Sequence, residues 1–315
     1  MSARAPTVTP PRGLGVGFDL PWGSGFVTDA ARGDHADDAL VRFLQRNEGR
    51  FVSMFGAWQP RSRQRLDARD YAPAWDDLFA RCPATPARTL HQTAFNLGAL
   101  EPYDRSALIE LTNAFIARYG LAWVNEDLGL WSIRGRSLPY PLPPYFTAKG
   151  LAAAIRNTAA VQSALAAPLV VEFPGFSDGL AVVVGSMHAY DFFRALAEET
   201  GSPVTLDVGH LLSYQWVRGR RGADLYADLD RLPLSHCLEV HLSGCAITDG
   251  RFVDAHHGVL LDAQLDLLAL LLPRCPSLRV VTYEDPRVTA DGELIEASRE
   301  GYARLCAMVD AWRDP

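Results

Sequence analysis

Histidine and carboxylate side chains end a series of short apolar segments in this chain. One such segment, PVTLDVGH (203–210), is a β-branched run that ends in Asp207 and His210. The pattern recurs at His91, Glu126, Asp127, Glu172, His241, Glu284 and Asp285, and the loop FVDAHHG adds Asp254 and His256. Ionised carboxylates are almost never buried unpaired, so core packing explains this set poorly. Converging carboxylates also repel one another unless cations lie between them. The pattern therefore predicts a metal site.

The residue types restrict the metal. Mixed imidazole and carboxylate ligands suit iron, zinc or manganese. The five cysteines show no CxxC spacing, which argues against an iron–sulfur cluster or a structural zinc site. Eight or more ligands exceed the need of one ion, so two or three ions are expected.

Taken singly, several of these residues have simpler interpretations. His91 alone is more often a hydrogen-bonded core histidine, and Glu126 with Asp127 could form a helix cap or a loop pair. The DAHHG stretch could be a plain polar turn. We expect His188 and His257, which follow no strand, to bind no metal. We expect these residues to surround the ligands or face the substrate: Phe173, Cys245, Tyr283 and Asp285.

Eight apolar runs alternate with segments of helical periodicity, and this alternation predicts the fold. The runs are 13–18, 50–55, 87–91, 120–127, 168–173, 203–210, 236–244 and 278–285, and the clearest helical segments are 106–120, 152–167, 189–201 and 263–275. Eight β-then-α units predict a closed (β/α)₈ TIM barrel, whose chemistry lies at the carboxyl ends of the strands. A doubly wound open sheet is the alternative, but the glycine fingerprint that it needs after its first strand is missing. We expect the Pro-rich stretch 137–146 to form a long loop after the fourth strand.

Composition sets the remaining limits. The chain has 315 residues, 48% of them hydrophobic and 21% charged, with a net charge of -7. The acidic balance argues against a nucleic-acid partner, and no stretch approaches the ~20 apolar residues of a membrane span. The odd number of cysteines, with no CxxC spacing, argues against a disulfide framework and predicts a reducing cytoplasmic location. Residues 1–12 have no apolar signal-peptide core and are expected to be a disordered lead, followed by one barrel domain over 13–315.

The order His, Glu, Asp-x-x-His, His, Asp-x-His, Glu on successive strands resembles the metal-site layout of xylose-isomerase-like barrels. Locally the sequence is more similar to the multinuclear non-heme iron-dependent oxidases, a family that includes MbnB and TglH. That family commonly reads S-[DE]-H-L-x-W-S, L-E-N-P, L-L-D-x-N-N, H-L-A-G-H, D-T-H and I-E-W-D, where this chain has NEDLGLWS, VEFPGF, TLDVGH, HLSGC, DAHHG and TYED. The passage VQSALAAPLVVEFP is similar too, and the resemblance runs from about Leu90 to Asp285.

The chain departs from the family pattern at a few positions. Asp127 and Cys245 stand where the family has His, Phe173 stands where it has Asn, and His210 lies near an Asn position. The chain is thus identified as a divergent member, in which at least one metal site could differ.

The resemblance implies an oxidase with two or three iron ions in mixed Fe(II)/Fe(III) states and with dioxygen as co-substrate. The substrate would be a peptide (the precursor of a ribosomally made natural product) or a small molecule, and a separate partner protein could recruit it. The implied metal ligands are His91, Glu172, Asp207, His210, His241, Asp254, His256 and Glu284, with Glu126 or Asp127 completing the set. Two alternatives remain: a zinc- or manganese-dependent hydrolase or isomerase of the xylose-isomerase-like or apurinic-endonuclease-like type, and an inactive peptide-binding barrel.

Overall fold

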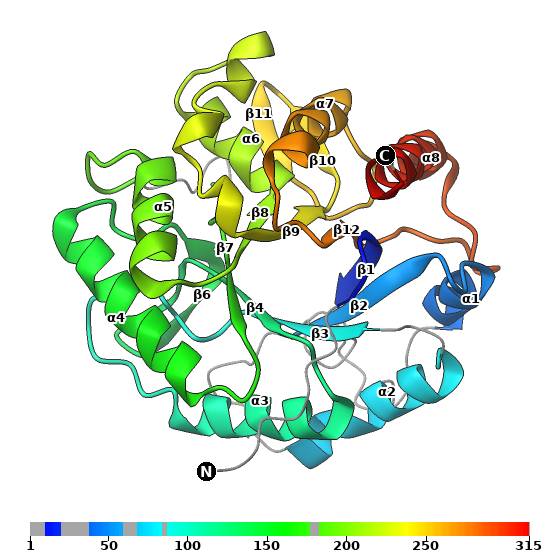
Figure 1. Cartoon of the computed structure of the whole chain (residues 1–315), viewed down its shortest axis with the longest axis horizontal. Coiled ribbons are helices and arrows are strands. Elements are labelled where there is room, and N and C mark those ends of the chain that lie inside the picture. Colours follow the sequence, from blue (N-terminus) through cyan, green and yellow to red (C-terminus); the bar gives the residue numbers. More distant parts are fainter. Residues whose placement is uncertain (1–9, 20–37, 59–67, 84–86, 177–182, 315) are drawn as a thin grey trace.

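Eight parallel strands close into a barrel in the computed structural model, which describes residues 10–19, 38–58, 68–83, 87–176 and 183–314 (Figure 1). The strands follow the order β1-β12-β9-β8-β7-β4-β3-β2, and β1 pairs with both β12 and β2. Their bounds are β1 (Gly13–Asp19), β2 (Phe51–Trp58), β3 (Ala87–Gln92), β4 (Val124–Asp127), β7 (Leu169–Glu172), β8 (Val204–Asp207), β9 (Cys237–Leu242) and β12 (Val280–Glu284). The predicted TIM barrel is confirmed, and the open sheet is excluded because the ring closes.

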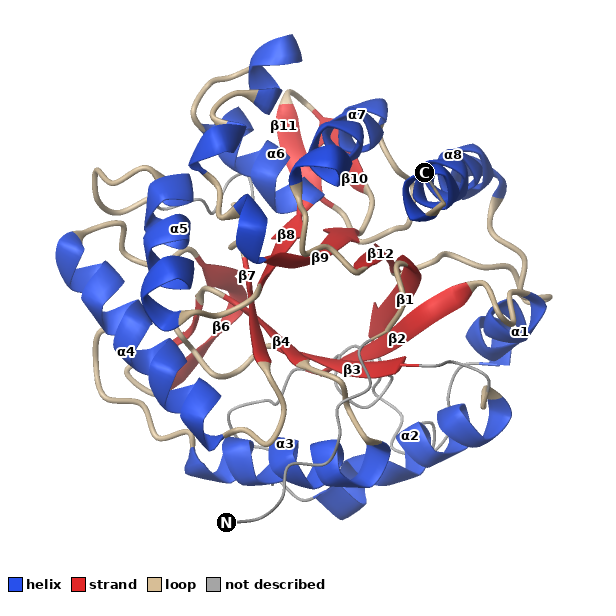
Figure 2. Cartoon of the chain, viewed as in Figure 1, coloured by secondary structure: helices blue, strands red, loops and turns tan. Residues whose placement is uncertain are grey.

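Helices surround the ring of strands (Figure 2). They are α1 (Asp38–Arg46), α2 (Ala68–Arg81), α3 (Ser106–Tyr119), α4 (Ala148–Ala164), α5 (Ala189–Thr200), α6 (Val208–Val217), α7 (Asp262–Leu271) and α8 (Glu296–Arg313). Short 3₁₀ helices lie at Gly222–Tyr226, Leu229–Arg231, Leu234–His236 and Leu272–Arg274. Within the described residues, no helix combines the length and hydropathy that a bilayer span requires. The predicted disordered lead falls largely on residues outside this description, and the single domain over 13–315 stays a prediction.

Two expectations about local structure are wrong. The stretch 137–146 forms no simple loop, because β5 (Leu130–Ile133) and β6 (Arg136–Leu142) pair as an antiparallel hairpin. The run 203–210 is not all strand: β8 ends at Asp207, whose carboxylate accepts the backbone N–H of His210 at 2.7 Å and so caps α6. A second hairpin, β10 (Cys245–Thr248) with β11 (Arg251–Asp254), follows β9.

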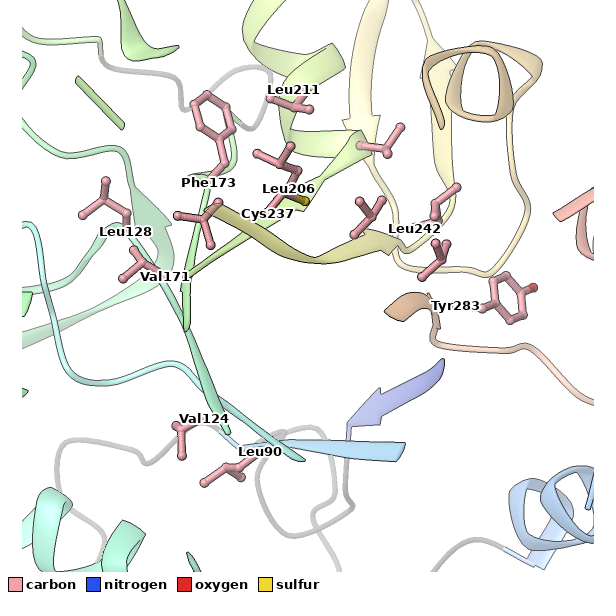
Figure 3. Close-up of a cluster of buried hydrophobic side chains, with 14 of the residues drawn as sticks. Leu90, Val124, Leu128, Val171, Phe173, Leu206, Leu211, Cys237, Leu242 and Tyr283 are labelled. Carbon is pink, nitrogen blue, oxygen red and sulfur yellow. The ribbon is translucent and has the colours of Figure 1, made fainter. Parts of the chain in front are cut away.

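Side chains alternate between the two faces of each strand, and this alternation separates the core from the site. Leu90, Val124, Val171, Leu206 and Tyr283 lie on the outer side of the strand ring, toward the helices (Figure 3). All five are buried. The residue that follows each of them along the strand therefore points into the barrel, and this rule aims the polar residues His91, Asn125, Glu172, Asp207 and Glu284 inward.

The glycines of β1 make room inside the barrel for an aromatic ring of β2. A Cβ atom at Gly17 would overlap the ring of Phe55. That ring lies 5.4 Å from the His91 ring and 5.3 Å from the His241 ring, measured between centroids. Phe55 thus packs beside two candidate ligands, and it can do so only because β1 has no side chain at position 17.

We predict that Gly17→Ala lowers the free energy of unfolding by roughly 1–3 kcal/mol, because the added methyl group overpacks the barrel against Phe55. Urea denaturation of Gly17→Ala, Phe55→Leu and the double variant provides the measurement. The double variant should lose less than the sum of the single losses, since the smaller side chain removes the clash. Strictly additive losses would contradict this packing.

Candidate metal centre

Eight side chains meet at the carboxyl ends of the strands. They form four overlapping groups in which the candidate ligand atoms lie within 4.8 Å of one another: His91–Glu172–His241, Asp127–Glu172–His210, Asp207–His241–Glu284 and Asp207–His210–Asp254. The first and last of these groups share no residue, and we call them the Glu172 triad and the Asp254 triad. Two separate ions could therefore be held at once, with no nitrogen shared between them.

The Glu172 triad is built around one carboxylate oxygen. Oε2 of Glu172 lies 2.8 Å from Nε2 of His91 and 3.2 Å from Nδ1 of His241. The three residues come from β7, β3 and β9, and all three are buried. One oxygen facing two imidazole nitrogens is an arrangement in which a cation could bind all three side chains.

Hydrogen bonds orient the side chains of the Asp254 triad. In each residue they occupy a polar atom that is not the candidate ligand atom. His210 shares a 2.7 Å hydrogen bond between Nδ1 and the Phe173 carbonyl, so Nδ1 carries the proton and Nε2 is left as the ligand atom. That Nε2 lies 3.2 Å from Oδ2 of Asp254. Ser243 donates its hydroxyl to Oδ1 of Asp254 at 2.7 Å. The backbone N–H of His210 similarly occupies Oδ1 of Asp207. One oxygen of each carboxylate therefore stays available for a cation.

Asp127 and Glu284 lie beside the two triads. Oε1 of Glu284 is 3.1 Å from Nδ1 of His241, and Asp127 is paired in register with Glu172 across β4 and β7. Each belongs to a group that shares one member with each triad. These two carboxylates could complete the coordination of either ion or bridge the two.

Burial and mutual repulsion control protonation in this cluster. Burial raises the pKa of Asp127 to about 6, with a further contribution from Glu172, and burial raises that of Asp207 to about 7. For the imidazoles burial acts in the opposite direction, but the Glu172 carboxylate outweighs it and raises the pKa of His91 to about 9. His241 and His91 together hold the pKa of Glu172 well below its usual range despite burial. Protons on the imidazoles and carboxylates thus offset the negative charge of the cluster. Bound cations would replace these protons.

A test of whether these residues fit a metal comes from an unsatisfied nitrogen. Nδ1 of His241 is fully buried and makes no well-aligned hydrogen bond among the described residues, although two carboxylate oxygens lie within 3.2 Å of it. A buried polar atom without a hydrogen bond is costly. Nitrogen and carboxylate oxygens around a common centre form a donor set that iron, manganese or zinc accepts. The residues fit such an ion.

Two of the sequence-predicted ligands stand apart from the four groups. Glu126 points away from the barrel interior, and its oxygens accept the backbone N–H groups of Phe95 at 3.0 Å and Ala94 at 3.2 Å. His256 lies at the edge of the cluster, with Nε2 3.3 Å from Asp254, and its side chain is 50% exposed. Its Nδ1 shares a 2.7 Å hydrogen bond with Asp285. Asp127 rather than Glu126 is thus the β4 carboxylate that faces the cluster.

The other singled-out residues support the cluster from outside. Phe173 packs among Phe176, Tyr190 and Phe193, and only its carbonyl reaches His210. Tyr283 lies outside the strand ring and donates its hydroxyl to the Gly258 carbonyl, so it does not face the barrel interior (Figure 3).

Cys245 is buried, with Sγ 3.8 Å from Oδ1 of Asp254. A Cβ atom at Gly209 would lie 2.8 Å from this sulfur, which explains the glycine in the first turn of α6.

Glu239, a fully buried carboxylate in β9, is not among the residues predicted from the sequence. Glu239 and His241 are two residues apart, so both side chains point into the barrel. The sequence CLEVHL contains the signal that could have predicted Glu239. A charged residue that alternates with apolar ones inside a predicted barrel strand must have hydrogen-bond partners in the barrel interior.

Comparisons with known proteins identify the family of this chain. A family model described as "RiPP precursor modification enzyme MbnB/TglH/ChrH" matches residues 75–300. A UPF0276 protein of Pseudomonas aeruginosa (strain UCBPP-PA14) is 27% identical over 182 residues, which are 57% of this chain and 61% of that protein. One from Streptomyces avermitilis is 30% identical over 215 residues, covering 65% of this chain and 42% of that protein. The chain spans about three fifths or less of the first curated relatives that it matches.

Solved structures share the barrel at low sequence identity. A xylose isomerase domain protein from Alicyclobacillus acidocaldarius has a TM-score of 0.53 at 17% identity, covering 95% of this chain and all of that one. A mannonate dehydratase from Streptococcus suis has a TM-score of 0.54 at 12% identity, covering 96% and 94%. These likenesses establish the xylose-isomerase-like fold.

Neighbouring carboxylates on opposite faces of β4 provide a matched test of the centre. Asp127→Asn should weaken Co(II) binding by at least about tenfold, because a charged ligand atom is lost. Glu126→Gln should leave Co(II) affinity and stoichiometry unchanged and should cost roughly 1–3 kcal/mol of stability, because a backbone N–H loses its acceptor. Calorimetric titration and urea denaturation measure the two effects. Equal losses of Co(II) affinity in both variants would contradict the placement of these side chains.

Metal affinity should rise with pH from about 5.5 to about 9, where the upper limit comes from the pKa of His91 at about 9. The raised pKa values of Asp127 and Asp207, about 6 and about 7, mean that protons occupy these carboxylates at the acidic end and must leave before a cation binds. Co(II) titrations at several pH values measure the slope. Asp207→Asn removes the group that titrates near 7, so its slope above pH 6.5 should be shallower. A wild-type affinity independent of pH would refute this competition.

Proposed function

Because the chain belongs to the family of RiPP precursor modification enzymes that includes MbnB, TglH and ChrH, we propose that it is a multinuclear non-heme iron-dependent oxidase. Its co-substrate would be dioxygen, and its substrate a peptide or an amino-acid-derived molecule. The observation that carries the proposal is the pair of triads with no shared residue, joined by Asp127 and Glu284. An isomerase or hydrolase that uses one ion needs no such second set of ligands.

The residues that would hold the ions follow from the two triads. His91, His241 and Glu172 would bind one ion, and Asp207, His210 and Asp254 the other. Asp127 and Glu284 would add carboxylate oxygens between them, and a third ion would have to share these carboxylates. Bound iron would supply electrons for dioxygen reduction and Lewis acidity toward a coordinated substrate atom.

The chain's own residues orient the ligands and exclude water. The Phe173 carbonyl and the Asp207 carboxylate fix His210 by its ring and by its backbone N–H. Phe55 packs against the rings of His91 and His241, so apolar surface lies on that side of the cluster. Ligands held in this way lose little conformational freedom when they act, which is how a protein places reacting groups next to each other.

The substrate would approach from the side of the Asp254 triad. In the Glu172 triad the side-chain exposure is 0% at His241, 2% at Glu172 and 9% at His91. In the Asp254 triad Asp207 is buried, but the exposure is 11% at His210 and 12% at Asp254. His256, beside Asp254, is half exposed. A cation in the Asp254 triad would therefore be the one that a substrate atom reaches, while the cation in the Glu172 triad stays deeper. Whether a separate protein delivers the substrate stays a prediction.

Anaerobically prepared protein should bind two or three iron ions per chain, and its absorption spectrum should change when oxygen is admitted. Metal analysis and anaerobic spectroscopy provide the measurement. Asp207→Asn serves as a control in which both the iron content and the oxygen response decrease. Tightly bound zinc or manganese without an oxygen response would favour a hydrolase or isomerase, and a protein without bound metal would favour a peptide-binding barrel.

A further inference from the structure

A second polar layer lies inside the barrel next to the ligands, and Glu239 is its centre. The side chain of Glu239 is fully buried, as is that of His241 two residues later in β9. A buried carboxylate is costly unless it is hydrogen-bonded from several sides. Its position toward the start of β9 makes it a poor candidate for substrate contact, so its interactions with the barrel interior must explain it.

Four donor groups surround this carboxylate. Oε2 accepts hydrogen bonds from Nε1 of Trp123 and from Nδ2 of Asn125, each at 2.8 Å. Oε1 accepts the hydroxyl of Thr282 and lies 3.4 Å from Nε2 of His241. Both oxygens are thus occupied by groups on β9 itself and on two other segments, β4 with the residue before it and β12, and the carboxylate has a fixed orientation.

His241 uses its two ring nitrogens in opposite directions. Nδ1 faces Glu172 and Glu284 in the metal centre, while Nε2 faces Glu239. A neutral imidazole carries one proton, and the nitrogen that binds a metal must be the one without it. An ionised carboxylate can only accept hydrogen bonds. Oε1 of Glu239 therefore favours the tautomer of His241 that carries its proton on Nε2 and its free lone pair on Nδ1.

Nδ2 of Asn125 also lies near Nε2 of His241, at 3.4 Å. Its Oδ1 accepts the hydroxyl of Thr205 at 3.1 Å, and this bond turns its Nδ2 toward Glu239 and His241. An amide NH₂ cannot accept the imidazole proton. Glu239 is therefore the acceptor available to Nε2–H.

We propose that Glu239 is a positioning residue that fixes the tautomer and the ring orientation of His241, so that Nδ1 is the metal-binding atom. The inference rests on the proposed metal centre but does not depend on oxygen chemistry. The carboxylate–imidazole–metal arrangement strengthens metal binding because the carboxylate stabilises the positive charge that the imidazole gains as a ligand.

Glu239→Gln tests the inference with almost no change of volume. The glutamine oxygen can still accept from Trp123 and Asn125, which places its NH₂ group toward Thr282 and Nε2 of His241. That NH₂ group would donate to Nε2 and move the imidazole proton to Nδ1, where it competes with the metal. Zn(II) affinity should therefore fall about 10–100-fold. Glu126→Gln is the control, because it makes the same substitution at an equally buried carboxylate outside the barrel interior.

The decisive readout is ¹⁵N NMR of histidine-labelled, Zn(II)-loaded wild-type protein, which reports the protonated nitrogen of each ring and needs no variant to fold. We expect His241 to carry its proton on Nε2 and to bind zinc through Nδ1. Zinc bound to Nε2, or an unchanged Zn(II) affinity in Glu239→Gln, would overturn the role of Glu239 alone. A wild-type protein that binds no Zn(II), Co(II) or iron would overturn the metal centre, and the inference with it.

Discussion

Repulsion among five carboxylates is the constraint on which this structure depends. Asp127, Glu172, Asp207, Asp254 and Glu284 converge at one end of the barrel in surroundings where little water reaches them. In such a medium like charges repel strongly, and each carboxylate needs a hydrogen-bond donor, a proton or a cation. Among the side chains, the imidazoles of His91, His210, His241 and His256 supply this compensation, and a pair of metal ions would supply it more completely.

The barrel meets this constraint by layers. Alternation along each strand aims every second side chain inward, so the ligand layer lies on a layer of Asn125, Thr205, Glu239 and Thr282. The polar atoms of that second layer bond to one another and to His241, which keeps them satisfied away from water. Apolar residues on the outer face of the same strands pack against the helices (Figure 3). The same strands thus form the site with their inward-facing side chains and the apolar core with their outward-facing ones.

The sequence was sufficient to predict the strands and the strand ends that carry candidate ligands, because apolar runs that end in His, Asp or Glu follow directly from the barrel's geometry. It was not sufficient to choose between Glu126 and Asp127, since that choice depends on which residue of β4 faces inward. His210 was placed at a strand end, although a cap by Asp207 starts α6 there. Glu239 could not be predicted from the strand ends, because it lies deeper in the barrel, toward the start of β9. The facing of residues along β4, a local helix cap and hydrogen bonds in the barrel interior decide these cases.

The most direct test of the account is the location of the ions themselves. Anomalous diffraction at the iron edge, from crystals of anaerobically loaded protein, would place each ion relative to its ligands. We expect one peak bound by His91, Glu172 and His241 and another bound by Asp207, His210 and Asp254, with nitrogen and oxygen ligands at about 2.0–2.2 Å. A single peak, or peaks away from these two triads, would contradict the central claim that the barrel holds a multinuclear metal centre.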